Sequence, residues 1–264
     1  MSQHPDLISH VIKIAGEAGA AIMDVYHSED LGATVKDDNS PLTRADLASN
    51  EIIVNGLAGI YEGVPIMTEE AKADPYEIRK GWGEYWCIDP LDGTKEFVKR
   101  RDEFTVNIAL MENGHPKLGV VHAPVTKDTY WAMKGVGAFK ETGDGEKKKI
   151  KVADYRAEKL KVIASRSHGS RELEDFIERL GSCERLSFGS SLKFCKVAEG
   201  SAHIYPRFGP TMEWDTAAAQ IVVEEAGGHV TDFNGRQLRY NKEDLHNPYF
   251  MVTGNPPYPW RELL

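Results

Sequence analysis

The sequence predicts an α+β first half joined to an α/β second half within one chain of 264 residues. In the first half, two stretches with helical spacing of apolar residues precede several β-rich runs separated by turns. In the second half, short strands alternate with helices, which is typical of an α/β arrangement. A hydrophobic content of 41% supplies a large core at this length. The composition therefore indicates a folded globular protein.

The first predicted helix covers residues 7–26, where apolar residues recur at helical spacing. Gly16 and Gly19 lower the helix propensity of this stretch and indicate close packing against a neighbour. Residues 35–41 are polar and rich in turn formers. We therefore expect a loop or a short hairpin after the helix.

A second helix is predicted to begin at Thr43, whose spacing to Asp46 resembles a capping box. The spacing alone favours a structural role for Asp46, because an acid in the first turn complements the helix dipole. Residues 64–70 then form a short apolar strand that ends in Glu69 and Glu70. Adjacent acids are common on protein surfaces, so this pair is weak evidence for a site by itself.

The chain is organised around a short apolar run that stops at a turn carrying carboxylates and a hydroxyl. Residues 86–88 indicate the end of a buried strand, and Pro90 is expected to stop it. Asp92 is expected to cap a helix, leaving the backbone N–H groups of Gly93 and Thr94 free for an anion. This stretch therefore predicts a combined metal and phosphate site.

Asp89, Asp92 and the Leu91 carbonyl together offer the hard oxygen ligands that Mg²⁺ accepts. An Asx-turn between a strand and a helix would explain the same pattern without any metal. An EF-hand loop is excluded, because it needs acidic or amide residues at positions one, three and five, and residues 90–93 do not supply them at those positions.

An antiparallel meander is predicted after this motif, from three β-rich runs at residues 104–111, 117–121 and 129–133. Residues 142–149 are highly charged and indicate a solvated loop at the seam between the two halves. We place the halves at residues 1–155, with most of the candidate metal ligands, and 156–264, with Asp215.

The alternating pattern of the second half consists of strands at residues 160–164, 185–188, 202–205 and 229–231 and helices at residues 171–180, 191–199 and 216–226. The last of these helices follows Glu213, Trp214 and Asp215, a second acidic helix start. Capping alone would explain Asp215.

The formal net charge of −9 argues against a nucleic-acid polymer as partner, because such a partner needs a basic face. A phosphate ligand would require metal ions and a few cationic side chains to reverse the field locally. Cys87, Cys183 and Cys195 have no spacing typical of disulfide frameworks or zinc sites, so we expect free, buried thiols. No membrane span or signal peptide is recognisable, so we expect a cytoplasmic protein.

The acidic strand end, the central turn and the Trp-Asp helix start occur in an order and at intervals that resemble the inositol monophosphatase superfamily of Mg²⁺-dependent, lithium-sensitive phosphatases. The resemblance covers nearly the whole chain. It implies a layered sandwich with alternating α-β-α-β-α layers, as in inositol monophosphatase and fructose-1,6-bisphosphatase.

Within that superfamily, residues 89–97 look like the bacterial 3′(2′),5′-bisphosphate nucleotidases. Inositol monophosphatases more often have Thr-Asn where this chain has Lys95 and Glu96. Residues 104–110, 165–168 and 189–193 agree with the nucleotidase pattern.

The resemblance also implies roles for individual residues. Two or three Mg²⁺ ions would be bound by Glu69, Asp89, the Leu91 carbonyl, Asp92 and Asp215. Asp46 and Thr94 would form the pair that activates water. The implied substrate-binding residues are Glu69, Leu91, Asp92, Gly93, Thr94, Ser165, His168, Ser190, Lys193 and Asp215. Without the resemblance, His168 would be a surface histidine and Lys193 a solvated helix lysine.

The implied activity is hydrolysis of 3′-phosphoadenosine 5′-phosphate to AMP and phosphate, a step linked to sulfate assimilation. The partner would be this small nucleotide bisphosphate, and the sequence leaves the oligomeric state open. Inositol monophosphatase is the alternative enzyme. A metal-binding regulatory protein without catalysis is an alternative of another class, disfavoured by the presence of Thr94 and Asp46. The resemblance also implies peripheral attachment to the cytoplasmic face of the inner membrane as an option.

Overall fold

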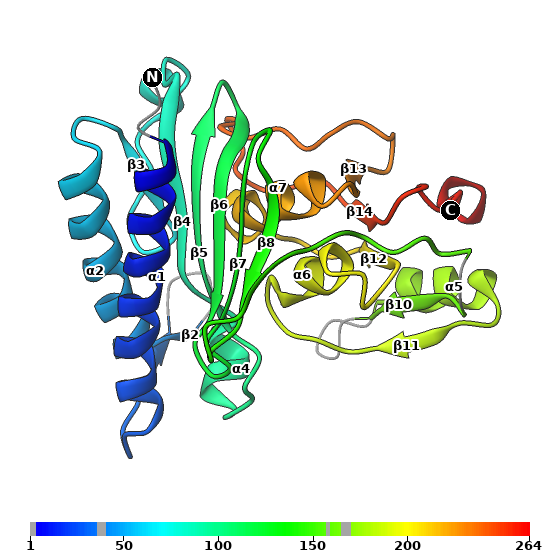
Figure 1. Ribbon diagram of the computed structural model, residues 1–264, viewed down its shortest axis with the longest axis horizontal. Coiled ribbons are helices and arrows are strands. Elements are labelled where there is room, and N and C mark those ends of the chain that lie inside the picture. The colour runs from blue at the N-terminus through cyan, green and yellow to red at the C-terminus, as the bar shows by residue number, and fades with distance from the viewer. Residues whose placement is uncertain (1–3, 36–40, 157–158, 165–169) are drawn as a thin grey trace.

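The computed structural model describes residues 4–35, 41–156, 159–164 and 170–264 and has five layers (Figure 1). Two helices cover one face of a seven-stranded sheet, and two further helices lie between that sheet and a five-stranded sheet. A fifth helix packs on the outer face of the smaller sheet. The predicted α-β-α-β-α sandwich is therefore confirmed.

The outer helical layer consists of α1 (His4–Tyr26) and α2 (Arg44–Ile60), which pack side by side. Thr43 caps α2 and forms the predicted capping box with Asp46. Between the two helices, β1 (Thr34–Val35) and β2 (Pro41–Leu42) pair antiparallel, which confirms the hairpin alternative.

Close packing is confirmed at one of the two helical glycines. A Cβ atom at Gly19 would lie 2.6 Å from the His122 ring, whereas one at Gly16 would meet nothing within 4 Å. Gly19 therefore brings the backbone of α1 against the large sheet, and the prediction for Gly16 is wrong.

The large sheet has strand order β3-β4-β5-β6-β7-β8-β9, in which only the β3–β4 pair is parallel. Its strands are β3 (Ile66–Thr68), β4 (Glu84–Asp92), β5 (Thr105–Glu112), β6 (His115–Ala123), β7 (Asp128–Met133), β8 (Gly137–Glu141) and β9 (Lys147–Lys149). Short helices α3 (Tyr76–Arg79) and α4 (Thr94–Val98) flank β4.

The predicted meander is confirmed, but β8 and β9 extend it. The stretch expected to be a solvated loop therefore ends in a strand. Residues Lys147–Lys149 are exposed in β9, so the sequence shows no alternation of hydrophobic and polar residues that would predict this strand pairing.

The prediction that Pro90 stops β4 is wrong, because the strand runs on to Asp92. The register between β4 and β5 shifts between Asp89 and Asp92, which marks a β-bulge. On the other side, the pairing of β3 with β4 ends at Ile88. Pro90 has no backbone N–H to donate. It lies in the bulge, where neither β3 nor β5 needs a hydrogen bond from this position, so the strand can continue through it.

The second half begins with β10 (Lys161–Ile163), α5 (Arg171–Leu180), β11 (Glu184–Leu186), α6 (Leu192–Ala198) and β12 (Ile204–Arg207). It continues with the 3₁₀ helix η1 (Glu213–Asp215), α7 (Ala217–Glu225), β13 (His229–Asp232), β14 (Phe250–Thr253) and the 3₁₀ helix η2 (Trp260–Leu263). Their sheet order is β11-β10-β12-β14-β13, with parallel pairing around β10 and antiparallel pairing around β14.

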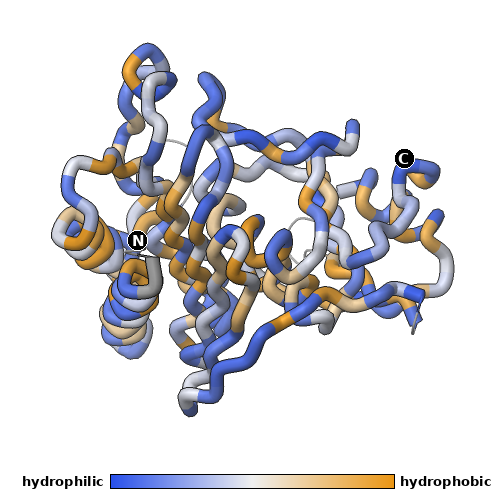
Figure 2. Tube along the Cα trace, turned by 45° about the horizontal axis from the view of Figure 1, so that its top comes forward, coloured by the Kyte–Doolittle hydropathy of each residue, from blue (hydrophilic) through white to orange (hydrophobic). Residues whose placement is uncertain are grey.

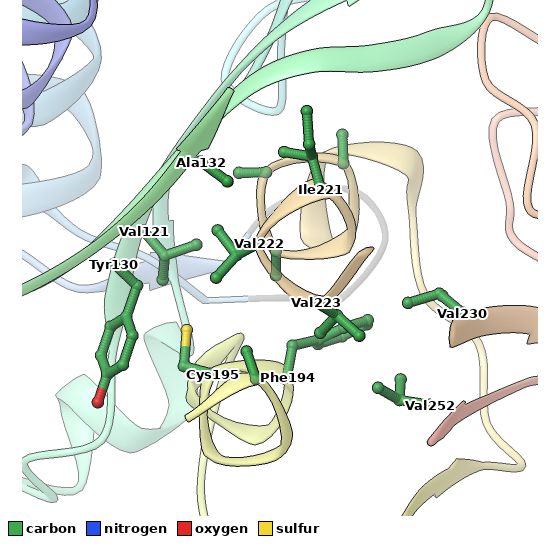
Figure 3. Close-up of a cluster of buried hydrophobic side chains, with 14 of the residues drawn as sticks. Val121, Tyr130, Ala132, Phe194, Cys195, Ile221, Val222, Val223, Val230 and Val252 are labelled. Carbon is green, nitrogen blue, oxygen red and sulfur yellow. The ribbon is translucent and has the colours of Figure 1, made fainter. Parts of the chain in front are cut away.

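The largest core cluster fills the space on both sides of α6 and α7 (Figure 3). Val222 of α7 lies toward Val121 and Tyr130 of the large sheet, whereas Val223 lies toward Val230 and Val252 of the small sheet. A second cluster lies between the large sheet and α1 and α2. Figure 2 shows hydrophobic residues concentrated along the strands and helices, with hydrophilic outer loops. The two clusters fix the large sheet between its helical layers.

The three cysteines are free, with Cys87 and Cys195 buried and Cys183 partly exposed. Across the described ranges, no helix has the length and apolar character needed to cross a bilayer. Peripheral attachment to a membrane has no support in the described structure and stays a prediction, as does the division at residue 155.

Candidate active site

An open cleft of about 240 Å³ lies where the end of β4, the start of α4, the loop before α6, the end of β12 and η1 meet. It is lined by Glu69, Asp89, Leu91, Asp92, Gly93, Thr94, Ser190, Lys193 and Asp215. Asp46 lies behind this lining and is reached through Thr94. The structure thus brings the described members of the predicted site together, and Ser165 and His168 lie outside the described residues.

Asp89 is the most buried carboxylate of the cleft, with 1% of its surface exposed. Burial raises the pKa of Asp89 well above its usual range, and the neighbouring Glu69, Asp92 and Asp215 raise it further. Side-chain hydrogen bonding with Glu69 makes a further, smaller contribution to the raised pKa of Asp89. The carboxylates at this end of the cleft are therefore close together and buried, so their negative charges are unfavourable without a counter-charge.

Asp92 is held by contacts from the second half of the chain. Its Oδ2 accepts hydrogen bonds from the backbone N–H of Ser191 at 2.6 Å and from the Ser191 hydroxyl at 2.8 Å. The amide of Asn107 lies 3.4 Å from the same oxygen. Burial nevertheless raises the pKa of Asp92, although Lys193 and these donors oppose the shift.

The prediction that Asp92 caps a helix is wrong. Gly93 is the N-cap of α4, and it has φ of 93°, a left-handed conformation that favours glycine. A glycine at this position turns the chain so that the Asp92 side chain leaves the helix and points to Ser191.

Asp215 closes the acidic end of the cleft from the opposite side. Its Oδ2 accepts the N–H of Met212, the N-cap of η1, at 2.9 Å, which is part of a capping box there. The N-cap of α7 is Thr216, so Asp215 caps the 3₁₀ helix and not α7. Burial raises the pKa of Asp215 to about 8, and the charge of Asp92 adds to this effect.

The donor chemistry of this end fits a divalent cation. Buried carboxylates that raise one another's pKa lose that penalty when a cation lies between them, and Mg²⁺ prefers such hard oxygen ligands. Among the described residues, no three Asp, Glu, His or Cys side chains already form a ready-made metal site. The fit therefore rests on the type, burial and charge of the donors.

Asp46 performs two functions with its two oxygens. Oδ2 accepts the backbone N–H of Thr43 at 2.7 Å and the Thr43 hydroxyl at 2.6 Å, which completes the capping box. Oδ1 lies 3.2 Å from the Thr94 hydroxyl. The structural role favoured by the sequence is correct, and it leaves the second oxygen aimed at the cleft lining.

The loop that carries Thr94 is fixed from two sides. The Thr94 hydroxyl lies 3.2 Å from the Leu91 carbonyl as well as from Asp46. Ser49, one turn after Asp46 in α2, donates to the Pro90 carbonyl at 2.7 Å. Helix α2 therefore positions the end of β4 relative to the hydroxyl.

Cationic side chains also line the cleft. Lys193 is 8% exposed, which contradicts a solvated helix lysine. Burial lowers the pKa of Lys193 to about 8, although the charge of Asp92 opposes this. Arg207 donates from Nη2 to the Pro210 carbonyl at 2.9 Å, while its buried Nε has no hydrogen-bond partner among the described residues.

Ser190 also lines the cleft and has φ of 46°. Its hydroxyl is buried and has no partner in the described part of the chain. Unsatisfied buried donors are costly, so a ligand that pairs with Ser190 and Arg207 would remove that cost.

Sequence reasoning missed Arg207, Ser191 and Asn107. Arg207 follows the predicted strand 202–205 and, at period two, shares a face with the cleft residue Tyr205. That alternation was the available signal for Arg207. Ser191 and Asn107 had no comparable local signal, because Asp92 lies 99 residues from Ser191 and on a different strand from Asn107.

Comparisons with known proteins agree with this architecture. Residues 5–255 match the model of the inositol monophosphatase family. The 3′(2′),5′-bisphosphate nucleotidase CysQ of Salmonella typhimurium is 48% identical over 251 residues, spanning 94% of this chain and 99% of that protein.

Two solved structures extend the comparison. The crystal structure of CysQ from Bacteroides thetaiotaomicron is 42% identical with a TM-score of 0.86, covering 96% of this chain and 98% of that chain. An IMPase from Thermotoga maritima is 28% identical with a TM-score of 0.78, covering 94% and 92%. The chain therefore belongs to the inositol monophosphatase family.

Proposed function

We propose that this chain is an Mg²⁺-dependent 3′(2′),5′-bisphosphate nucleotidase that hydrolyses 3′-phosphoadenosine 5′-phosphate to AMP and phosphate. The observation that carries the proposal is that one cleft is lined both by buried carboxylates and by the cationic side chains of Lys193 and Arg207. The substrate has two phosphates, and such a lining offers both metal ligands and cations to bind them. The name of the relatives at 48% and 42% identity supports the same reaction.

The carboxylate end would hold the metal. Magnesium dependence is general in the inositol monophosphatase family. We assign Glu69, Asp89, the Leu91 carbonyl, Asp92 and Asp215 as ligands of two or three Mg²⁺ ions. When bound, the ions would supply positive charge for the reacting phosphate and make a water more acidic. Ser191 orients the Asp92 carboxylate for this task through its N–H and hydroxyl.

Thr94 and Asp46 would handle the proton of the attacking water. The Thr94 hydroxyl can pass its own proton to Asp46 Oδ1, 3.2 Å away, while it accepts one from the water. The capping contacts on Oδ2 hold the Asp46 carboxylate in place during this exchange. The protein forms no covalent bond to the phosphate, because phosphoryl transfer depends mainly on positioning and charge.

The cationic end would bind the remainder of the substrate. Lys193 and Arg207 offer positive charge for the phosphate that is not cleaved, and Ser190 offers a hydroxyl that lacks a partner among the described residues. Gly93 would place its backbone N–H near the reacting phosphate. Contacts from Ser165 and His168 stay predictions.

A phosphate-release assay tests the proposal. Purified protein is given 3′-phosphoadenosine 5′-phosphate or inositol monophosphate, each with Mg²⁺ and with a chelator. We expect rapid Mg²⁺-dependent release from the nucleotide and much slower release from inositol monophosphate. A preference for inositol monophosphate would establish the alternative enzyme, and release from neither substrate would favour a non-catalytic metal-binding protein.

A further inference from the structure

We propose that Phe188 is the platform on which the purine base of the substrate stacks, and that it sets the preference for nucleotides over small phosphate esters. This inference rests on the proposed nucleotidase function. Four aromatic side chains line the described part of the cleft, namely Phe188, Phe194, Tyr205 and Phe250. An aromatic ring can stack on any base, provided that one of its faces is accessible.

Only Phe188 of these four meets that requirement. Phe194, Tyr205 and Phe250 are at most 2% exposed, and they contact one another with ring centroids 5.3 to 5.9 Å apart. Phe188 is partly exposed and makes no ring contact with another described aromatic residue. Its ring is therefore the one aromatic surface that the described cleft lining offers to a ligand.

One face of the Phe188 ring is approached by a cation from a residue that does not line the cleft. The Lys196 ammonium lies 5.6 Å from the ring centroid, and the same ammonium forms an ion pair with Glu199 at 2.7 Å. A cation on one face draws on the electron density of the ring, which favours an electron-rich partner such as a purine on the other face. The ring thus has a cation over one face, while Phe188 stays partly exposed in the cleft lining.

The backbone after Phe188 is rigid. A Cβ atom at Gly189 would lie 2.5 Å from the Glu103 carbonyl, so this glycine packs directly against the neighbouring loop. Ser190 follows in a left-handed conformation, and Ser191 then binds Asp92. Three residues span at most about 11 Å, so Phe188 lies within the reach of one nucleotide whose phosphate is at the carboxylates.

Lys193 and Arg207 line the same cleft as Asp92 and Asp215. Under the proposed function the two cations would hold the uncleaved phosphate, and the reacting phosphate would lie at the metal ligands Asp92 and Asp215. A base attached to the ribose between these two phosphates then has the Phe188 ring as its available aromatic partner in the described lining.

The test compares wild type, Phe188→Leu and Phe188→Tyr on two substrates. One is 3′-phosphoadenosine 5′-phosphate, and the other is ribose 3,5-bisphosphate, which keeps both phosphates but has no base. Phe188→Leu keeps an apolar side chain and removes the ring, so KM for the nucleotide should rise about tenfold, the scale of one stacked base. Its KM and kcat for the base-free substrate should match wild type, which also shows that the variant is folded.

Phe188→Tyr keeps the ring and should retain a KM for the nucleotide within about twofold of wild type. The inference is overturned if Phe188→Leu leaves the nucleotide KM unchanged, or if it impairs both substrates equally. A wild-type protein that hydrolyses neither bisphosphate would instead refute the proposed function, so the two failures are distinguishable.

Discussion

His122 makes the stability of the protein fall in mildly acidic solution. Its ring is 7% exposed, lies against the backbone of α1 at Gly19, and has its Nδ1 2.9 Å from the Thr129 hydroxyl. Burial lowers the pKa of His122 to about 4, with only a small opposing effect from Asp128. The folded protein therefore keeps this imidazole neutral at a pH where the unfolded chain takes up a proton.

The direction and the size of this loss of stability follow from the difference in proton binding between the folded and unfolded states. Between the unfolded pKa of 6.5 and the folded pKa of about 4, the unfolded state binds more protons, so the free energy of unfolding falls as the pH falls. Across this whole pH interval the free energy of unfolding falls by about 3 kcal/mol. At pH 5.5 the loss relative to neutral pH should be about 1.4 kcal/mol, and at pH 4.5 about 2.5 kcal/mol.

Urea unfolding of wild type and His122→Gln at pH 7.5, 5.5 and 4.5 measures this loss. Carboxylates titrate equally in both proteins, so the difference between their free energies of unfolding isolates His122. We expect wild type to lose about 1.4 kcal/mol relative to the variant by pH 5.5. His229→Gln, at an exposed position, should follow wild type at every pH. If the free energies of unfolding of wild type and His122→Gln fall by the same amount as the pH is lowered, the reasoning is refuted.

Three further predictions concern the cleft. Asp92→Asn should lower kcat/KM at least about a hundredfold and abolish the rise in Tm that Mg²⁺ causes, while its Tm in a chelator should match that of wild type. A normal rise in Tm with Mg²⁺ would show that Asp92 is not a metal ligand. Thr94→Ala should lower kcat about a hundredfold or more with little change in Mg²⁺ affinity, and a pure KM effect would contradict a proton relay. Lys193→Ala should raise KM for the nucleotide about thirtyfold and affect inositol monophosphate much less, whereas equal losses would assign Lys193 to the carboxylate end.

The elements of this fold were predictable where one local signal dominates. Helix α5 is amphipathic and begins at a serine cap, and its bounds match the predicted residues 171–180. Strands β9 and β14 were missed for opposite reasons. The three lysines of β9 carry no hydrophobic alternation, and β14 is buried at every position, so its pattern has no period. Both strands are defined by their pairing, β9 with β8 and β14 with β12, and a local sequence pattern carries no information about these partners.

The end of β4 shows how a correct local rule can give a wrong boundary. Proline cannot donate to a ladder, which is why a stop at Pro90 was expected. The bulge between Asp89 and Asp92 removes the need for a donor there, and it also turns successive carboxylates toward the cleft. The same irregularity therefore misleads the strand prediction and builds the site.

The acidic end of the cleft was predictable because its residues lie at conspicuous chain positions, but its assembly was not. Ser191 lies within hydrogen-bond distance of the Asp92 carboxylate at 2.8 Å, the Asn107 amide at 2.8 Å and the Asp215 carbonyl at 2.9 Å. One buried hydroxyl thus connects the end of β4, the strand β5 and the turn before α7. Since these contacts exist only when α6 and α7 are packed between the two sheets, the orientation of Asp92 depends on the core that surrounds those helices. Substitutions in that core can therefore weaken metal binding without touching a ligand, and this long-range dependence has no trace in local sequence patterns.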